Sequence, residues 1–192
     1  MSPRLAVELT PTHVRALVAS SWRDAALRTV EVAWSPDDPG GGIAALRGAV
    51  GPVESVAVAV GLGLLQVAGV ALPPTTDEVR ERIVALETER WFPLAGAPSG
   101  PPVLVSCMAP GGAVAFAAAA PALERWCAAL ESLAPIVRVE AAPVALARAL
   151  RRVPGGPSQA TYAIPLDHDD RGMVSVRDGR VTGLTGILSD IT

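Results

Sequence analysis

The order of apolar and polar residues predicts strands at the start of the chain. Apolar residues dominate or alternate with polar ones at residues 4–9, 13–19 and 26–33, and short connections separate these runs. Three consecutive strands of this kind predict an antiparallel meander. The next stretch, residues 35–42, is rich in Pro, Asp and Gly and predicts a loop. A short helix is expected over residues 43–50.

The rest of the chain predicts further helices and strands and ends in a second meander. A continuous apolar run at residues 56–60 is typical of a strand covered on both faces. Pro121 suits the first turn of a helix, and Asp178-Gly179 is a strong two-residue hairpin signal. One face of the helix at Pro121 carries apolar side chains, namely Leu123, Trp126, Cys127 and Leu130. The other predicted elements are strands at 64–72, 103–108, 113–119, 136–139, 161–166, 172–177 and 180–188, helices at 121–133 and 143–151, and loops at 95–102 and 153–158.

The segment at residues 71–94 carries the most informative pattern. Thr76 can cap a helix, and Asp77 and Glu78 place negative charge on its first turn, where the helix dipole favours it. Pro93 ends this helix, because proline lacks an amide hydrogen and disfavours helical geometry at the residue before it. The helix should bury one apolar stripe, formed by Val79, Ile83, Leu86 and Trp91.

Three features of this segment occur in a fixed order. Leu72-Pro73 follows a strand, Glu87 and Glu89 lie in the helix, and Trp91-Phe92-Pro93-Leu94 closes it. This order resembles PilM-like and type II secretion L-like proteins of the actin-like ATPase (ASKHA) superfamily. The run at residues 136–150, a strand leading into an Ala- and Leu-rich helix with Arg148, is similar to the same family.

The resemblance implies an α/β fold of the actin-like, ribonuclease H-like kind. A mixed sheet flanked by helices would carry a small inserted α+β subdomain. Residues 1–70 would hold the first meander and a helix–strand unit, residues 71–120 the inserted subdomain, and residues 121–192 the return to the main sheet and the second meander. The family's second lobe would begin shortly after Thr192, so we expect it to be absent or truncated.

The resemblance also implies where nucleotide chemistry should lie. In this superfamily the first hairpin carries an Asp-x-Gly turn that holds phosphate and organises magnesium. The matching positions carry Glu8 in place of Asp and Leu9 in place of Gly, followed by Thr10, Pro11 and Thr12. Leu blocks the close approach of backbone to phosphate, and Pro removes an amide donor. We therefore expect degenerate phosphate turns, no catalytic residue and no cofactor, with ATP and magnesium as the alternative.

Other candidate chemistry is weak. The second phosphate turn, expected near residues 163–166, lacks its acid, and residues 167–170 place three Asp and His168 there instead. These side chains form either a relocated metal or acid–base site or a solvated turn. His13 is either catalytic or an exposed residue at the start of a strand. Cys107 and Cys127 are expected to be buried thiols, with no ligand spacing for a metal.

Composition excludes several classes of function. The chain has no Lys, so it has no Walker-type lysine and no lysine for a Schiff base. Its net charge of −3 gives little electrostatic support for nucleic-acid binding. The apolar runs are far shorter than the roughly 20 residues of a spanning helix, and the N-terminus lacks a signal-peptide pattern. We therefore expect a cytoplasmic protein.

Three functions remain open. The resemblance implies a non-catalytic cytoplasmic scaffold of a type IV pilus or type II secretion assembly platform, which meets the membrane only through a cytoplasmic segment of an inner-membrane partner. Trp91, Phe92 and Leu94 could anchor that partner, or they could belong to the core. One alternative is an ATP-binding subunit with a modified phosphate site, whose second lobe another chain supplies. The other is a self-assembling structural subunit that pairs in homo- or hetero-oligomers through the strand at 180–188.

Overall fold

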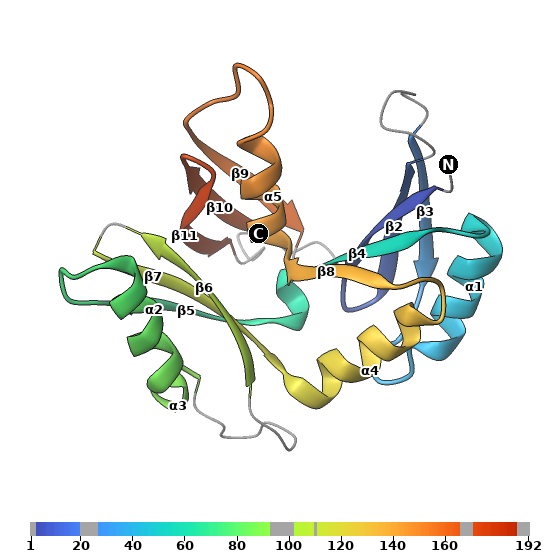
Figure 1. Ribbon diagram of the computed structural model, residues 1–192, viewed down its shortest axis with the longest axis horizontal. Helices are drawn as coiled ribbons and strands as arrows, with labels where there is room; N and C mark the ends of the chain where they lie inside the picture. Colours follow the sequence, from blue (N-terminus) through green and yellow to red (C-terminus); the bar gives the residue numbers. More distant parts are fainter. Residues whose placement is uncertain (1–2, 20–26, 93–101, 110, 166–170, 188–192) are drawn as a thin grey trace, which may run out of the picture.

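The central unit is a mixed sheet of five strands in the order β3-β2-β1-β4-β8 (Figure 1). The computed structural model describes residues 3–19, 27–92, 102–109, 111–165 and 171–187. Strands β1 (Arg4–Leu9), β2 (His13–Ala19) and β3 (Leu27–Ala33) form the predicted antiparallel meander. Strands β4 (Ser55–Val60) and β8 (Ile136–Ala141) run parallel to β1.

Two helices cover one face of this sheet. Alternate residues of β1 point toward helices α1 (Gly40–Val50) and α4 (Ala120–Glu131), and Leu5, Val7 and Leu9 are buried there. Trp34 and Trp126 pack edge to face in the same core, with ring centroids 6.1 Å apart. On the opposite face, helix α5 (Ala142–Leu150) packs beside β4 and β8 and leaves the β1–β3 part uncovered by described residues.

A second sheet forms the inserted unit, in the order β5-β7-β6. Strands β5 (Gln66–Ala71), β6 (Pro102–Ala109) and β7 (Gly112–Ala119) are antiparallel, and the one-turn helix η1 (Leu62–Leu64) leads into β5. Helices α2 (Asp77–Leu86) and α3 (Thr88–Trp91) lie on one face, where Val70, Val84 and Phe92 share a core with the alanines of β7.

The third sheet is the predicted second meander, in the order β11-β10-β9. It comprises β9 (Gln159–Pro165), β10 (Arg171–Arg177) and β11 (Arg180–Ile187). Asp178 and Gly179 have φ of 50° and 72°, so the predicted two-residue hairpin is confirmed. Phe116 of β7 joins the core of this sheet, and β11 lies against β6 and β7.

The prediction of a loop over 35–42 is wrong at its end, because α1 begins at Gly40. The carbonyl of Pro39 accepts a hydrogen bond from the Ile43 amide at 3.0 Å and starts the helix. A Cβ at Gly42 would lie 2.4 Å from the Cβ of Trp34. The glycines therefore belong to a helix that begins in close contact with the preceding segment.

The predicted buried stripe of the α2 region is wrong in part, because Ile83 and Trp91 pack against the core and the other two members do not. The Thr76 cap is confirmed, since its hydroxyl accepts from the Val79 amide at 3.5 Å. Val79 and Leu86, however, are 46% and 79% exposed, whereas Val84 is fully buried. The stripe assumed one continuous helix, but the chain breaks at Glu87 and α2 meets the alanine-lined sheet through Val84.

Candidate functional site

The turn between β1 and β2, where the resemblance implies a phosphate site, is closed by its own hydrogen bonds. The Thr10 amide and hydroxyl both donate to the carbonyl oxygen of His13, at 2.9 Å each, and the His13 amide donates to the Thr10 hydroxyl at 3.0 Å. Trp34 Nε1 donates to the Thr10 carbonyl at 2.6 Å, and the Trp34 amide donates to the Thr12 carbonyl at 3.0 Å. Since Pro11 has no amide hydrogen, three of the four amide positions at 10–13 are unable to hold a phosphate.

Leu9 ends β1 inside the core rather than beside a ligand. Its side chain is fully buried among the residues that face α1 and α4. Its carbonyl accepts from the Gly61 amide at 2.7 Å, and a Cβ at Gly61 would lie 2.5 Å from that oxygen. The position that carries Gly in the superfamily motif is therefore a packing position here.

Glu8 belongs to a charged group on the uncovered face of the five-stranded sheet. Arg15 Nε lies 2.9 Å from Glu31 Oε2, and an Arg15 terminal nitrogen lies 3.9 Å from Glu8 Oε2. Burial raises the pKa of the Glu8 carboxyl above its ordinary value; Arg15 opposes this rise and Glu31 adds to it. One guanidinium thus faces two carboxylates, and the contacts of the group are ion pairs between its own members.

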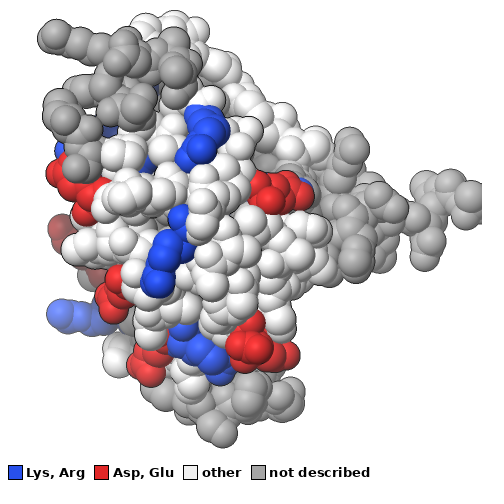
Figure 2. All heavy atoms as spheres, turned by 90° about the vertical axis from the view of Figure 1, so that its right-hand side faces the viewer, with Lys and Arg blue, Asp and Glu red and all other residues white. Residues whose placement is uncertain are grey.

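A hollow of about 670 Å³ separates this group from the ion pair of Arg148 and Glu140, and Ala57 and Ala59 line its floor. The described residues hold no cluster of three or more His, Cys, Asp or Glu suited to a metal ion. On the side shown in Figure 2, acidic and basic side chains are interspersed among uncharged surface, with no patch of one sign.

His13 begins β2 and is tied into the turn. Its Nδ1 lies 2.9 Å from the Thr12 hydroxyl, and its Nε2 lies 4.0 Å from a Glu31 carboxylate oxygen. The side chain is 42% exposed. It therefore fits the predicted alternative of an exposed residue at the start of a strand.

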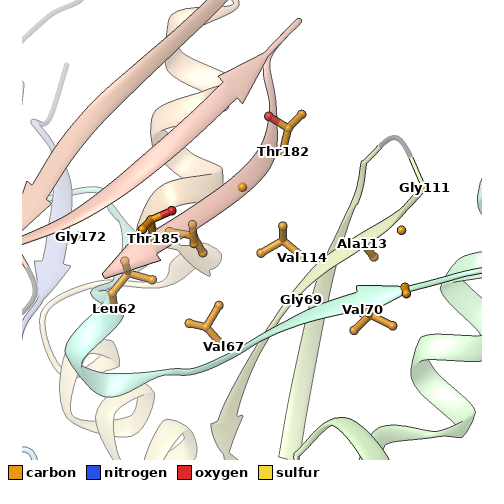
Figure 3. A pocket seen from close by; sticks show the side chains of 14 residues that line it. Leu62, Val67, Gly69, Val70, Gly111, Ala113, Val114, Gly172, Thr182 and Thr185 are labelled. Carbon is orange, nitrogen blue, oxygen red and sulfur yellow. The ribbon is translucent and has the colours of Figure 1, made fainter. Parts of the chain in front are cut away.

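An uncharged groove lies between the inserted sheet and the third sheet (Figure 3). Its volume is about 620 Å³. Val67, Gly69 and Val114 line it from β5 and β7, and Thr182 and Thr185 face it from β11. Leu62 of η1 stands at one end. Among its described lining residues no side chain is charged, and threonine hydroxyls are the side-chain polar groups.

The predicted anchor residues lie apart from this groove. Phe92 is 3% exposed in the core beneath α2 and α3. Trp91 packs against the same core, and the guanidinium carbon of Arg90 lies 4.7 Å from its ring centroid. Leu94 lies outside the described residues, as do the acidic residues and His168 at 167–170. Trp91 and Phe92 thus occupy positions that suit the core alternative.

Cys127 is a free, partly buried thiol on α4. Burial raises the pKa of this thiol, and Glu131 adds to the rise. The structure does not describe the side chain of Cys107.

The sequence pattern did not identify Val67, Gly69 and Thr182 as groove residues. The available signal was an uncharged strand in which small and branched side chains alternate.

No protein-family model matches the chain, and no curated protein sequence matches it significantly. Solved structures do resemble it. The cytoplasmic domain of EpsL, an inner-membrane component of the type II secretion system of Vibrio cholerae, is 15% identical with a TM-score of 0.61, over 96% of this chain and 71% of that chain. A chain of the PilM–PilN type IV pilus biogenesis complex is 13% identical with a TM-score of 0.64, over 96% and 61%. A Bacteroides thetaiotaomicron protein with an actin-like ATPase fold and unknown function is 9% identical with a TM-score of 0.53, over 97% and 70%.

These likenesses show the fold. The predicted actin-like α/β architecture, with a mixed sheet and a small inserted sheet, is confirmed, and so is the resemblance to PilM and EpsL at the level of structure. The chain spans 61% to 71% of the length of the three matched chains. Strand β5 pairs with β7, so residues 66–71 join the inserted sheet, while the division into 1–70, 71–120 and 121–192 stays a prediction. In the part of the chain that the structure describes, no helix is long and apolar enough to cross a membrane.

Proposed function

We propose that this chain is a non-catalytic actin-like scaffold of a type IV pilus or type II secretion assembly platform. It acts on the cytoplasmic side of the inner membrane and binds a short cytoplasmic segment of an inner-membrane partner in the groove between the second and third sheets. The uncharged groove beside Val67 and Gly69 carries this proposal, because it offers apolar surface and exposed backbone rather than reactive groups. The structural likeness of the chain to EpsL and to the PilM–PilN complex supports the choice of a secretion or pilus assembly platform.

The closed turn at Thr10–His13 supports a role without nucleotide turnover. A phosphate cradle needs free amides and a close backbone approach, whereas this turn uses its amides internally and buries Leu9. Calorimetric titration of ATP with magnesium tests this directly. We expect no heat of binding up to about 1 mM nucleotide. Micromolar, magnesium-dependent binding would restore the ATP-binding alternative.

The scaffold role is tested with peptides. Synthetic, fluorescein-labelled cytoplasmic segments of the single-span inner-membrane proteins of the source organism are titrated with the protein, and fluorescence anisotropy reports binding. We expect one segment to bind and Val67→Glu to weaken it by roughly tenfold or more, since the new carboxylate is placed in an uncharged groove.

Leu86→Glu is the matched control, because Leu86 is an exposed apolar residue on α2 that does not line the groove. It should leave the affinity unchanged. Equal loss with both variants, or binding by none of the segments, would contradict the proposal.

A further inference from the structure

Gly69 lies inside a regular strand, and the surrounding structure does not require a glycine there. Strand β5 pairs with β7 without a register shift, and Gly69 lies opposite Val114 in this ladder. Gly69 does not have a positive φ, so its backbone conformation suits any residue. Apart from its chain neighbours, a Cβ built on Gly69 would meet no atom within 4 Å. A glycine weakens the interior of a strand and often marks a place where a ligand approaches closely.

Other glycines differ from Gly69 in this respect. A Cβ on Gly112 would collide with a carbonyl oxygen of β5, so this groove position needs a glycine. Gly183, on the β11 side of the groove, lies beside the register shift between β10 and β11. Gly41 and Gly48 also border open space, but they are exposed on helix α1 and do not line the groove. Gly69 therefore combines open space, regular strand geometry and a place in the groove.

The absent side chain leaves a notch in the β5 side of the groove. Val67 and Gly69 face the groove, because the alternating residues Ala68 and Val70 pack in the core beneath α2. Figure 3 shows Val67 and Val114 beside the position of Gly69, so the notch has apolar neighbours. No described residue that lines the groove is charged. A charged side chain in the notch would lose its hydration without gaining a partner, whereas an apolar one would gain from leaving water.

We propose that the notch at Gly69 selects a large apolar side chain, of the size of leucine or phenylalanine, on the partner segment that binds in the groove. This inference rests on the proposed scaffold function for the identity of that segment. Val67 is 41% exposed, and a side chain seated over Gly69 would cover it. The groove volume of about 620 Å³ leaves room for a short segment together with this side chain. Gly69 is then a specificity-determining residue, which acts through the space that it leaves.

A series of short peptides tests the notch without knowledge of the partner. The probes are tripeptides with blocked ends, in which two threonines flank a central alanine, valine, leucine or phenylalanine. Each is titrated into the isotope-labelled protein, and two-dimensional NMR gives its affinity. The leucine peptide should bind roughly tenfold more tightly than the alanine peptide, because it buries more apolar surface. An affinity that does not depend on the central residue, or no saturation by the leucine peptide up to about 20 mM, would overturn the inference.

Gly69→Val tests the protein side, because the new side chain fills the notch. The leucine peptide should bind this variant roughly tenfold more weakly, with the affinity of the alanine peptide. The melting temperature, measured by circular dichroism, should rise, since valine suits a strand interior better than glycine. Ala33→Val is the matched control, because Ala33 is an exposed strand residue that does not line the groove, and it should leave every peptide affinity unchanged. A lower melting temperature for Gly69→Val, or failure of that variant to fold, would show that the glycine is structural and would contradict the inference.

The outcomes separate this inference from the scaffold function. If an inner-membrane segment binds and Gly69→Val leaves its affinity unchanged, the function stands and the notch has no part in recognition. If no such segment binds but the tripeptides show a size dependence that Gly69→Val removes, the notch stands and the proposed partner is wrong. If sedimentation shows a dimer that Gly69→Val dissociates, the side chain over Gly69 comes from a second copy of the chain, and the inference of a partner segment is wrong.

Discussion

Replacing Leu9 with Ala tests whether this residue, at the position where the resemblance implies a phosphate turn, is a core residue. Leu9 is fully buried and lies among the residues that face α1 and α4. Neighbouring side chains therefore have little freedom to fill the space that a truncation would leave. A Leu→Ala change at such a site costs about 2–5 kcal/mol in transfer energy and cavity formation. A loss of about 3 kcal/mol lowers the melting temperature of a chain of this size by roughly 6–12 °C. The Leu9 carbonyl bond to Gly61 does not involve the side chain, so the turn itself should survive.

Urea unfolding followed by tryptophan fluorescence measures this loss, since Trp34 and Trp126 report on the same core. Leu86→Ala is the matched control. It removes the same atoms from a side chain that is 79% exposed, so the free energy of unfolding should change by no more than about 0.5 kcal/mol. A loss below about 1 kcal/mol for Leu9→Ala, or one equal to that of the control, would refute the packing role of Leu9.

Two further predictions test the start of α1 and the charged group. Gly42→Ala should destabilise the protein by about 1–3 kcal/mol, because the new Cβ would lie 2.4 Å from that of Trp34; Gly41→Ala, with open space around it, should stabilise it by about 0.5–1 kcal/mol in the same urea titration. The folded protein holds the Glu8 proton more tightly than the unfolded chain, so ionisation of Glu8 lowers stability as pH rises above the ordinary value of 4.5. Glu8→Gln should therefore gain stability relative to the unmodified protein between about pH 4 and pH 7. The interpretation of Glu8 fails if the difference in stability between Glu8→Gln and the unmodified protein stays constant with pH. The interpretation of Gly42 fails if Gly42→Ala leaves the free energy of unfolding unchanged.

The sequence predicted the strands well where local pattern decides them. Residues 4–9 and 13–19 are strands at the predicted bounds, and Asp178-Gly179 forms the predicted hairpin. Alternation and turn chemistry act over a few residues, so a single sequence carries them. The order of the predicted elements was also enough to indicate the actin-like resemblance, because that order is read directly along the sequence.

The errors arose where distant segments decide the local structure. Gly42 belongs to a helix because Trp34 comes close enough to exclude a Cβ, which the glycine run alone does not reveal. The buried face of α2 depends on the alanines of β7 and on the break at Glu87, so helical spacing alone gave Val79 and Leu86 instead of Val84. The groove is formed by β5 and β11, which lie more than a hundred residues apart in the sequence. Its residues are small and uncharged, and no motif marks them.

The closed turn and the groove are linked through a single short segment. The Gly61 amide bonds to the Leu9 carbonyl, and the next residue, Leu62, is 7% exposed and forms one end of the groove. A Cβ at position 61 would collide with the Leu9 carbonyl, so the backbone of β1 and that of η1 approach as closely as a glycine allows. In the superfamily motif a close backbone approach at this end of β1 serves a phosphate. Here the close approach is made by Gly61 instead, which holds η1 and, through Leu62, one end of the uncharged groove.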